Sequence, residues 1–305
     1  MRRLAAAAVV LVALAACSRG PSRGGARVMA SEPFLADIAW EVAGDRFAVQ
    51  ALLPTGTDPH TWEPAPRDAA AVASADLFIV NGAGLEGFLA ALLEGLGSEG
   101  PRVVEACAGL APRVPREGEH ADTADAHETD PHFWLDPLGV VRYAETIRDA
   151  LSGLDPAGAD AFRANAAAYA EKLRDLDRWI AGEVSRIPPE RRLLVTSHES
   201  LGYFADRYGF RVVGTVIPGV STGSSPSAKE LAALAALLER TGAPAVFVEE
   251  GTDPRLARQL AVETGVRLVT GLRTHALTGP DGPAPTYLAM MRGDVRTIAD
   301  ALASP

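Results

Sequence analysis

The stretch PAGADAFRANAAAYAEKLRDLDRWIAGEVSR, residues 156–186, lies near the middle of the chain and has a helical pattern. Its apolar side chains recur at intervals of three, four or seven residues: Phe162, Ala166, Tyr169, Leu173, Leu176, Ile180 and Val184. This spacing places them in one stripe and predicts a single helix of roughly thirty residues. Asp155 is the expected N-cap, Pro156 opens the helix, and Pro188 and Pro189 end it. So long a helix predicts a stiff connector that limits hinge motion.

Short apolar runs alternate with helical patterns on both sides of this helix. Before it, we expect strands at 27–30, 47–53, 77–80 and 102–106 and helices at 34–43 and 67–74; after it, strands at 193–196, 211–216, 245–248 and 267–270. Such alternation is typical of parallel βαβ units. We therefore expect an α/β fold with two lobes of parallel β-sheet flanked by helices, residues 27–153 and 190–305, joined by a rigid connecting helix at 155–187. Ser227 and Glu230 have the spacing of a capping box that opens a further helix through Leu238.

The N-terminus has the form of an export signal. Arg2 and Arg3 precede an apolar run, Leu4 to Ala16, that is shorter than the roughly 20 residues of a membrane-spanning helix. Small residues before Cys17 resemble a bacterial lipoprotein cleavage box, so residues 1–17 are the expected signal peptide and Cys17 the lipidated residue. The alternative is a signal peptide that contains a cysteine by chance. Residues 18–26 then form a flexible tether, and Cys107 has no partner cysteine in the mature chain.

Composition narrows the class of partner. The 305 residues suffice for two domains with cores of their own, and 48% hydrophobic with 22% charged residues is typical of a globular protein. With 29 basic and 39 acidic residues, the formal charge of −10 repels phosphate backbones. We therefore expect no nucleic-acid partner.

Single histidines follow the ends of predicted strands. His60, His198 and His275 each come a few residues after such a strand, and His132 lies elsewhere in the first half. Ligands of open α/β sheets bind at the carboxyl edge of the strands. Imidazole suits zinc, copper, nickel or iron, whereas magnesium and calcium prefer oxygen donors. Taken one at a time, each histidine is better explained as an ordinary capping or surface residue, because no compact ligand motif links them.

Two further histidines lie in an acidic segment. Residues 116–130, REGEHADTADAHETD, carry His120 and His127 among many carboxylates and have no apolar side chain larger than alanine. This composition predicts a mobile loop. The two histidines either collect metal transiently or sit in a solvated loop without that role.

Five stretches resemble a known family. They are DPHTWEP (58–64), ADLFIVNGAGLEGFL (75–89), DPHFWLDP (130–137), TSHESLGYFADRYG (196–209) and PAPTYLAMMRGDVRTIADAL (283–302). Together they look like the zinc- and manganese-binding solute-binding proteins of ABC importers, across the whole mature chain and in the same order. The resemblance implies an exported, lipid-anchored protein at the outer face of the cytoplasmic membrane or in the periplasm. It would bind Zn²⁺ between two lobes and pass it to a permease with a cytoplasmic ATPase, as a monomer and without catalysis.

The resemblance also assigns ligands. His60, His132 and His198 fall on three family ligand positions, and imidazole at His198, where manganese members usually have Glu, favours zinc over Mn²⁺. The fourth position commonly holds Asp, and here His275 stands in that segment. Either His275 completes a tetrahedron, or water or a carboxylate does. Glu199, Glu249 and Glu250 are candidates to support the ligands from behind. Asp136 could orient His132 or, equally, start the following helix.

Some features of the sequence are also typical of enzymes. Gly82-Ala83-Gly84-Leu85-Glu86-Gly87 satisfies the dinucleotide pattern G-x-G-x-x-G after a predicted strand, and Glu105 lies near the ribose-binding distance, which would suggest an oxidoreductase. A zinc hydrolase would need the second histidine of H-E-x-x-H, which is absent after His198-Glu199. A manganese- or iron-binding relative, a zinc metallochaperone and an additional role in cell adhesion remain open.

Overall fold

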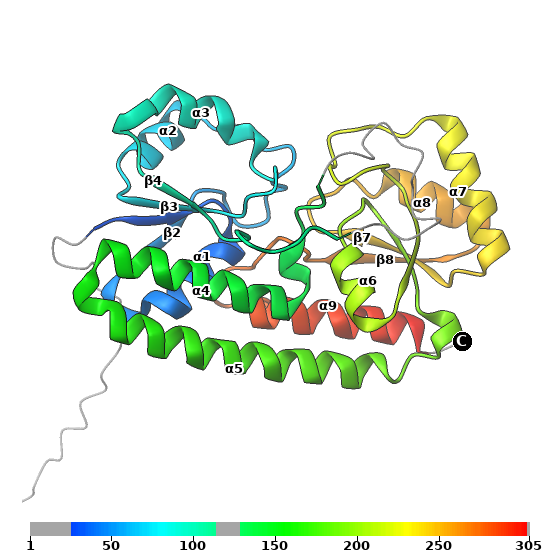
Figure 1. Ribbon diagram of the computed structural model, residues 1–305. Helices are drawn as coiled ribbons and strands as arrows, with labels where there is room; N and C mark the ends of the chain where they lie inside the picture. Colours follow the sequence, from blue (N-terminus) through cyan, green and yellow to red (C-terminus); the bar gives the residue numbers. More distant parts are fainter. Residues whose placement is uncertain (1–25, 114–128, 304–305) are drawn as a thin grey trace, which may run out of the picture.

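The computed structural model describes residues 26–113 and 129–303 and has two lobes side by side (Figure 1). Each lobe holds a four-stranded sheet, with strand orders β2-β1-β3-β4 and β6-β5-β7-β8, and every pairing within both sheets is parallel. The expected two-lobed α/β fold is confirmed. Strands β3, β5 and β7 are buried along their whole length, as expected of parallel strands covered on both faces.

The first lobe alternates strands and helices. Its strands are β1 (Val28–Ala30), β2 (Val49–Ala51), β3 (Leu77–Val80) and β4 (Arg102–Glu105). Its helices are α1 (Pro33–Ala43), α2 (Pro66–Ala73), α3 (Ala90–Leu96) and α4 (Pro137–Leu154), with 3₁₀ turns η1 (Gly44–Arg46), η2 (Gly87–Leu89), η3 (Gly97–Glu99) and η4 (Phe133–Leu135).

The second lobe repeats the arrangement. Its strands are β5 (Leu193–Thr196), β6 (Arg211–Thr215), β7 (Ala245–Glu249) and β8 (Arg267–Leu272), and its helices are α6 (Gly202–Tyr208), α7 (Ala228–Thr241), α8 (Arg255–Thr264) and α9 (Tyr287–Leu302). Before α7, Ser227 and Glu230 form the expected capping box, each side chain bonding the other residue's backbone N–H. None of the helices in the described part of the chain has the length and apolar character needed to cross a membrane.

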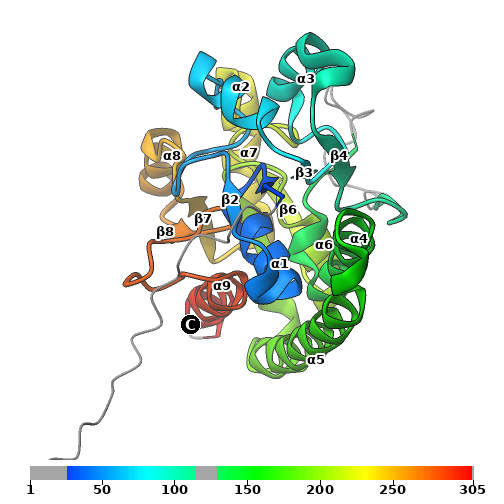
Figure 2. The same ribbon diagram turned by 90° about the vertical axis from the view of Figure 1, so that its left-hand side faces the viewer.

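The connecting helix α5 (Ala159–Val184) runs beneath both lobes (Figure 1). It packs against α1, α4 and α9, and these four helices lie together in the turned view (Figure 2). All seven residues of the predicted stripe are buried in one core cluster that also contains Phe34 from the first lobe and Tyr287 from the second. The apolar face of one helix is therefore shared between the lobes, which stiffens the connection.

The start of α5 differs from the expectation. Residues Pro156–Gly158 form a 3₁₀ turn, η5, and the α-helix begins at Ala159. Asp155 does not cap the helix with its side chain; its carboxylate instead accepts a hydrogen bond from Arg46 Nε at 2.7 Å. The prediction of an Asp155 cap was wrong because a long-range ion pair takes the carboxylate that the cap would need.

Candidate metal centre

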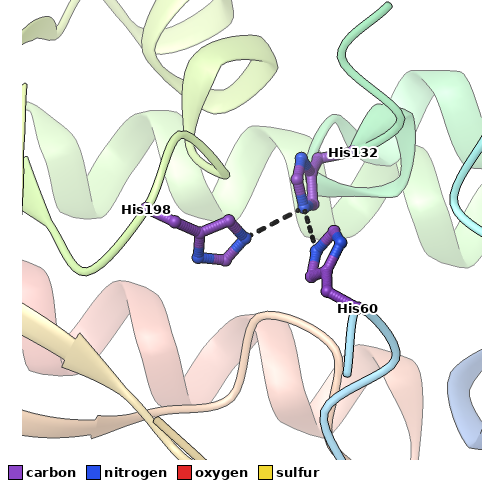
Figure 3. A group of neighbouring side chains, drawn as sticks. All are labelled: His60, His132 and His198. Atoms are coloured by element: carbon purple, nitrogen blue, oxygen red, sulfur yellow. Dashed lines mark hydrogen bonds between the residues drawn. The ribbon is translucent and has the colours of Figure 1, made fainter. Parts of the chain in front are cut away.

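Three histidines from the two lobes meet at one point. His60 lies in the loop after β2, His132 directly precedes η4, and His198 follows β5. One ring nitrogen from each lies within 4.8 Å of the others, and their rings face one another in Figure 3. Nε2 of His132 is 3.3 Å from Nε2 of His60 and 3.2 Å from Nε2 of His198. The three Nε2 atoms are therefore close enough together for one metal ion to bind all of them.

Buried carboxylates stand behind two of these rings. Oδ1 of Asp130 lies 2.8 Å from Nδ1 of His132, and Oε2 of Glu249 lies 2.5 Å from Nδ1 of His198. A carboxylate at Nδ1 fixes the ring orientation and leaves Nε2 directed at the ligand, as is common for metal-binding histidines. Both carboxylates are nearly inaccessible, at 9% and 2% exposure. Asp130 and Glu249 thus orient His132 and His198 so that both rings can present Nε2 to the same cation.

Burial sets the protonation of the site. It lowers the pKa of His60 to about 2, with the neighbouring His132 as the next cause, and it lowers the pKa of His132 well below the usual range. Burial also acts downward on the pKa of His198, but the Glu249 carboxylate outweighs it and the pKa is raised. Glu249 shows the complementary effect, since its charge pairing with His198 lowers its pKa to about 2 in spite of burial. His60 and His132 are thus neutral, as ligands must be.

His275 lies beside the cluster rather than within it. Its ring is 6.5 Å from that of His60, edge-on at 89°, and the residue is 2% exposed. Nδ1 is 3.1 Å from the hydroxyl of Thr274, while Nε2 is buried and has no hydrogen-bond partner among the described residues. An unsatisfied buried nitrogen is costly, so this atom is available to a ligand that enters the site.

Comparisons with known proteins bear on this geometry. The family described as zinc-uptake complex component A, periplasmic, matches residues 28–301. The chain belongs to this family. Manganese-binding lipoprotein MntA of Halalkalibacterium halodurans is 34% identical over 278 residues, 91% of this chain and 89% of the relative. Iron-binding protein YfeA of Yersinia pestis is 34% identical over 273 residues, 90% of this chain and 85% of the relative.

Solved structures agree with the fold. The periplasmic zinc-binding protein TroA of Treponema pallidum superposes with a TM-score of 0.81 at 28% identity, covering 92% of this chain and all of the other. The resemblance of the sequence to zinc- and manganese-binding solute-binding proteins of ABC importers is confirmed. Proteins similar to this chain are thus named as binding zinc, manganese or iron.

The acidic residues near the histidines of this family member have different roles. Asp136 starts the following helix, one of the two roles expected for it: its Oδ1 accepts the backbone N–H of Leu138 at 2.9 Å as the N-cap of α4. Asp130 supports His132 instead, a role that sequence reasoning missed although Asp130 stands two residues before the histidine. The Glu250 carboxylate lies 2.7 Å from Nε of Arg273, so it forms an ion pair with this arginine.

Several predicted residues receive no new support. Glu199 is anchored by its backbone N–H to the Gly219 carbonyl at 2.9 Å, and its supporting role stays a prediction. His120, His127 and Cys17 lie outside the described residues, as do the signal peptide and most of the tether and acidic loop.

The glycine-rich turn has a structural use in this family member. Glu86 folds back so that its carboxylate accepts hydrogen bonds from the backbone N–H groups of Asn81 and, at 3.1 Å, Gly82, and from the Ser31 hydroxyl at 2.7 Å. A dinucleotide would need those N–H groups for its phosphates. The Glu86 carboxylate occupies these donors and repels phosphate, so this turn does not fit a dinucleotide.

Proposed function

We propose that this chain captures Zn²⁺ between its lobes and hands it to a membrane permease, as the extracytoplasmic metal-binding subunit of an ABC importer. The observation that carries the proposal is the convergence of three Nε2 atoms, from His60, His132 and His198, contributed by both lobes. A site divided between two lobes favours the closed arrangement when the ion is present and frees the ion when the lobes part. That behaviour suits capture and release.

The donor set supports zinc over manganese. All three converging atoms are imidazole nitrogens, which suit zinc, whereas manganese is better served by carboxylate and carbonyl oxygens. Asp130 and Glu249 supply negative charge behind the rings, so the ion's charge is balanced without a carboxylate ligand. The relatives MntA and YfeA are named for manganese and iron, so these are the metals to test against zinc.

His275 is the fourth ligand in this proposal. Its free Nε2 and its ring position beside His60 allow it to complete the tetrahedral set that zinc prefers. Four protein ligands leave no open coordination position, whereas a catalytic zinc keeps one for water. The proposal therefore includes no catalytic activity, and a hydrolysis assay in the presence of zinc is expected to be blank.

The remaining parts of the proposal come from the sequence and the family. Relatives of this chain are named as lipoproteins, which agrees with lipidation at Cys17 and attachment to the outer face of the cytoplasmic membrane. A permease and its cytoplasmic ATPase are the proposed partners of a monomeric protein, and lobes 27–153 and 190–305 with the connector 155–187 are the proposed division of the chain.

Metal competition tests the proposal. Chelator-stripped protein is dialysed against equal concentrations of Zn²⁺, Mn²⁺ and Fe²⁺, and the metal bound per chain is measured by elemental analysis. We expect one zinc per chain, lost in His60→Ala and kept in Thr61→Ala, a neighbouring exposed position of the same loop. Bound manganese or iron in place of zinc would overturn the choice of metal, and equal retention of metal by His60→Ala would overturn the site.

A further inference from the structure

Two ligand-bearing turns of the first lobe have the same local structure. The sequence Asp-Pro-His occurs at 58–60 and again at 130–132. In both turns Oδ1 of the aspartate accepts the backbone N–H of the histidine two residues later, at 2.9 Å. Each aspartate therefore fixes the backbone that carries a proposed ligand.

The second lobe contacts the first of these turns through a hydroxyl. Oγ1 of Thr222 donates to Oδ2 of Asp58 at 2.6 Å, and Thr222 lies in the loop between β6 and α7. Gly251, which follows β7, approaches the same place: a Cβ there would lie 3.5 Å from the Gly56 carbonyl oxygen and 3.9 Å from the Asp58 Cβ. Two loops of the second lobe thus lie against the turn that carries His60.

The loop with Thr222 is also bound to the His198 segment. Ile217 donates its backbone N–H to the Ser197 carbonyl at 2.7 Å, and Glu199 donates its own to the Gly219 carbonyl at 2.9 Å. These bonds flank His198 on both sides. Hydrogen bonds therefore join the His60 backbone to Asp58 and Thr222, and the short stretch of chain from Thr222 back to Gly219 and Ile217 joins them to the residues next to His198.

We propose that Thr222 is a positioning residue that holds the two ligand-bearing loops in register and so sets how long the metal stays bound. The inference rests on the proposed metal-binding function. Parting the lobes separates His60 from His198, and the Thr222–Asp58 bond has to break for that separation. A hydrogen bond to a carboxylate is stronger than one between neutral groups, which makes this bond a barrier to release.

The surroundings of the bond suit a contact that opens and closes. Asp58 and Thr222 are only half-buried, and they line a cavity of about 540 Å³ between the lobes together with Thr61, Gly251 and Thr252. Water that enters the cavity can solvate both groups once they part, so breaking the bond leaves no buried polar atom unsatisfied. The contact thus slows opening without forbidding it.

Metal release kinetics test the inference. Zinc-loaded full-length protein is mixed with excess chelator in a stopped-flow instrument, and the dissociation rate is measured for wild type, Thr222→Val, Thr222→Ser and Ser224→Ala. Val keeps the shape of Thr without the hydroxyl, and Ser keeps the hydroxyl. Ser224 is exposed in the same loop, and its hydroxyl donates to the Pro218 carbonyl of that loop at 3.1 Å. We expect release about tenfold faster from Thr222→Val, the scale of one lost charge-assisted hydrogen bond, with near wild-type rates from the other two.

The outcomes separate this inference from the function on which it rests. Wild type that retains zinc while Thr222→Val releases it at the wild-type rate would overturn the positioning role and leave the metal site standing. Equal acceleration in Thr222→Val and Thr222→Ser would also overturn it, since the hydroxyl would then be irrelevant. Wild type that holds no zinc would overturn the proposed function and the inference together. Melting curves of the metal-free proteins check that all four chains are folded.

Discussion

Nδ1 of His198 lies 2.5 Å from Oε2 of Glu249, and both side chains are fully enclosed by protein. The second carboxylate oxygen, Oε1, accepts a hydrogen bond from the Ser200 hydroxyl. Glu249 closes strand β7, so a rigid element of the second lobe sets the direction of the His198 ring. The ligand is therefore oriented before any metal arrives, which lowers the cost of ordering it on binding.

Loss of this support should weaken zinc binding. Glu249→Gln keeps the size of the side chain but removes the charge that stabilises His198 in its metal-binding orientation. We expect zinc affinity to fall about 10- to 100-fold, the usual cost of losing such a partner, as measured by competition with a chromophoric chelator. Glu250→Gln is the matched control, because that carboxylate pairs with Arg273. Equal losses in both variants would show that general charge, not the His198 contact, matters.

Zinc binding should weaken as pH falls below neutrality. Burial raises the pKa of Asp130 to about 7, and the Glu249 carboxylate raises the pKa of His198, so both groups take up protons as the pH falls. Protonation removes the negative charge of Asp130, which makes it a weaker acceptor for the His132 ring, and the proton on His198 competes with the ion. The pKa values of His60 and His132 are lowered, so these rings release no proton in this range. Affinity is therefore expected to decline as the pH falls through about 7, where Asp130 takes up a proton.

Calorimetry measures the proton count directly. Zinc is titrated at pH 6 and pH 8 in buffers of different ionisation enthalpy, and more protons should leave the protein at pH 6. Asp130→Asn should release fewer at pH 6 than wild type does. The same count at both pH values would contradict this assignment of protons.

His275 offers a test of the fourth ligand. If its Nε2 binds the ion, His275→Ala should still hold one zinc per chain, but with lower affinity. The affinity should be lower than that of Glu249→Gln, because His275→Ala loses a direct ligand and Glu249→Gln loses only a group that orients one. Affinity by chelator competition and stoichiometry by elemental analysis give both quantities. His275→Ala with wild-type affinity would leave the fourth position to water.

The core beneath the site should dominate stability. Phe34 of α1 stacks on Trp134 with 4.5 Å between ring centroids, and both side chains are fully buried. The ring centroid of Trp134 lies 5.1 Å from that of His132. Phe34→Ala is expected to lower the free energy of unfolding by about 3–5 kcal/mol through lost burial and a cavity. Val262→Ala, at an 81% exposed position, should change it by less than about 0.5 kcal/mol. Denaturant titration of the metal-free proteins compares the two.

Periodicity predicted the fold well because it reflects burial. The strands 77–80 and 193–196 coincide with the predicted ranges, and the remaining strands differ by a few terminal residues. The stripe from Phe162 to Val184 was likewise visible, since each of its residues faces the core. Asp155 was misjudged because its partner, Arg46, lies 109 positions away, and sequence patterns carry no information on such pairs.

The site was less accessible to sequence reasoning. Spacing alone placed His60 and His198 at strand ends, but only the family resemblance grouped them with His132. The repeated Asp-Pro-His sequence could have identified Asp130 as the partner of His132. Asp136, the aspartate that follows His132, was considered for that role and instead caps α4. No pattern marks Thr222, because its role depends on a contact with Asp58 164 positions away in the chain.

The most direct test of the whole account is anomalous diffraction at the zinc absorption edge from crystals of the zinc-loaded protein. The account predicts one peak between the lobes, about 2.0–2.1 Å from the Nε2 atoms of His60, His132 and His198. A zinc ion bound at any other place, or one held by ligands from a single lobe, would contradict it.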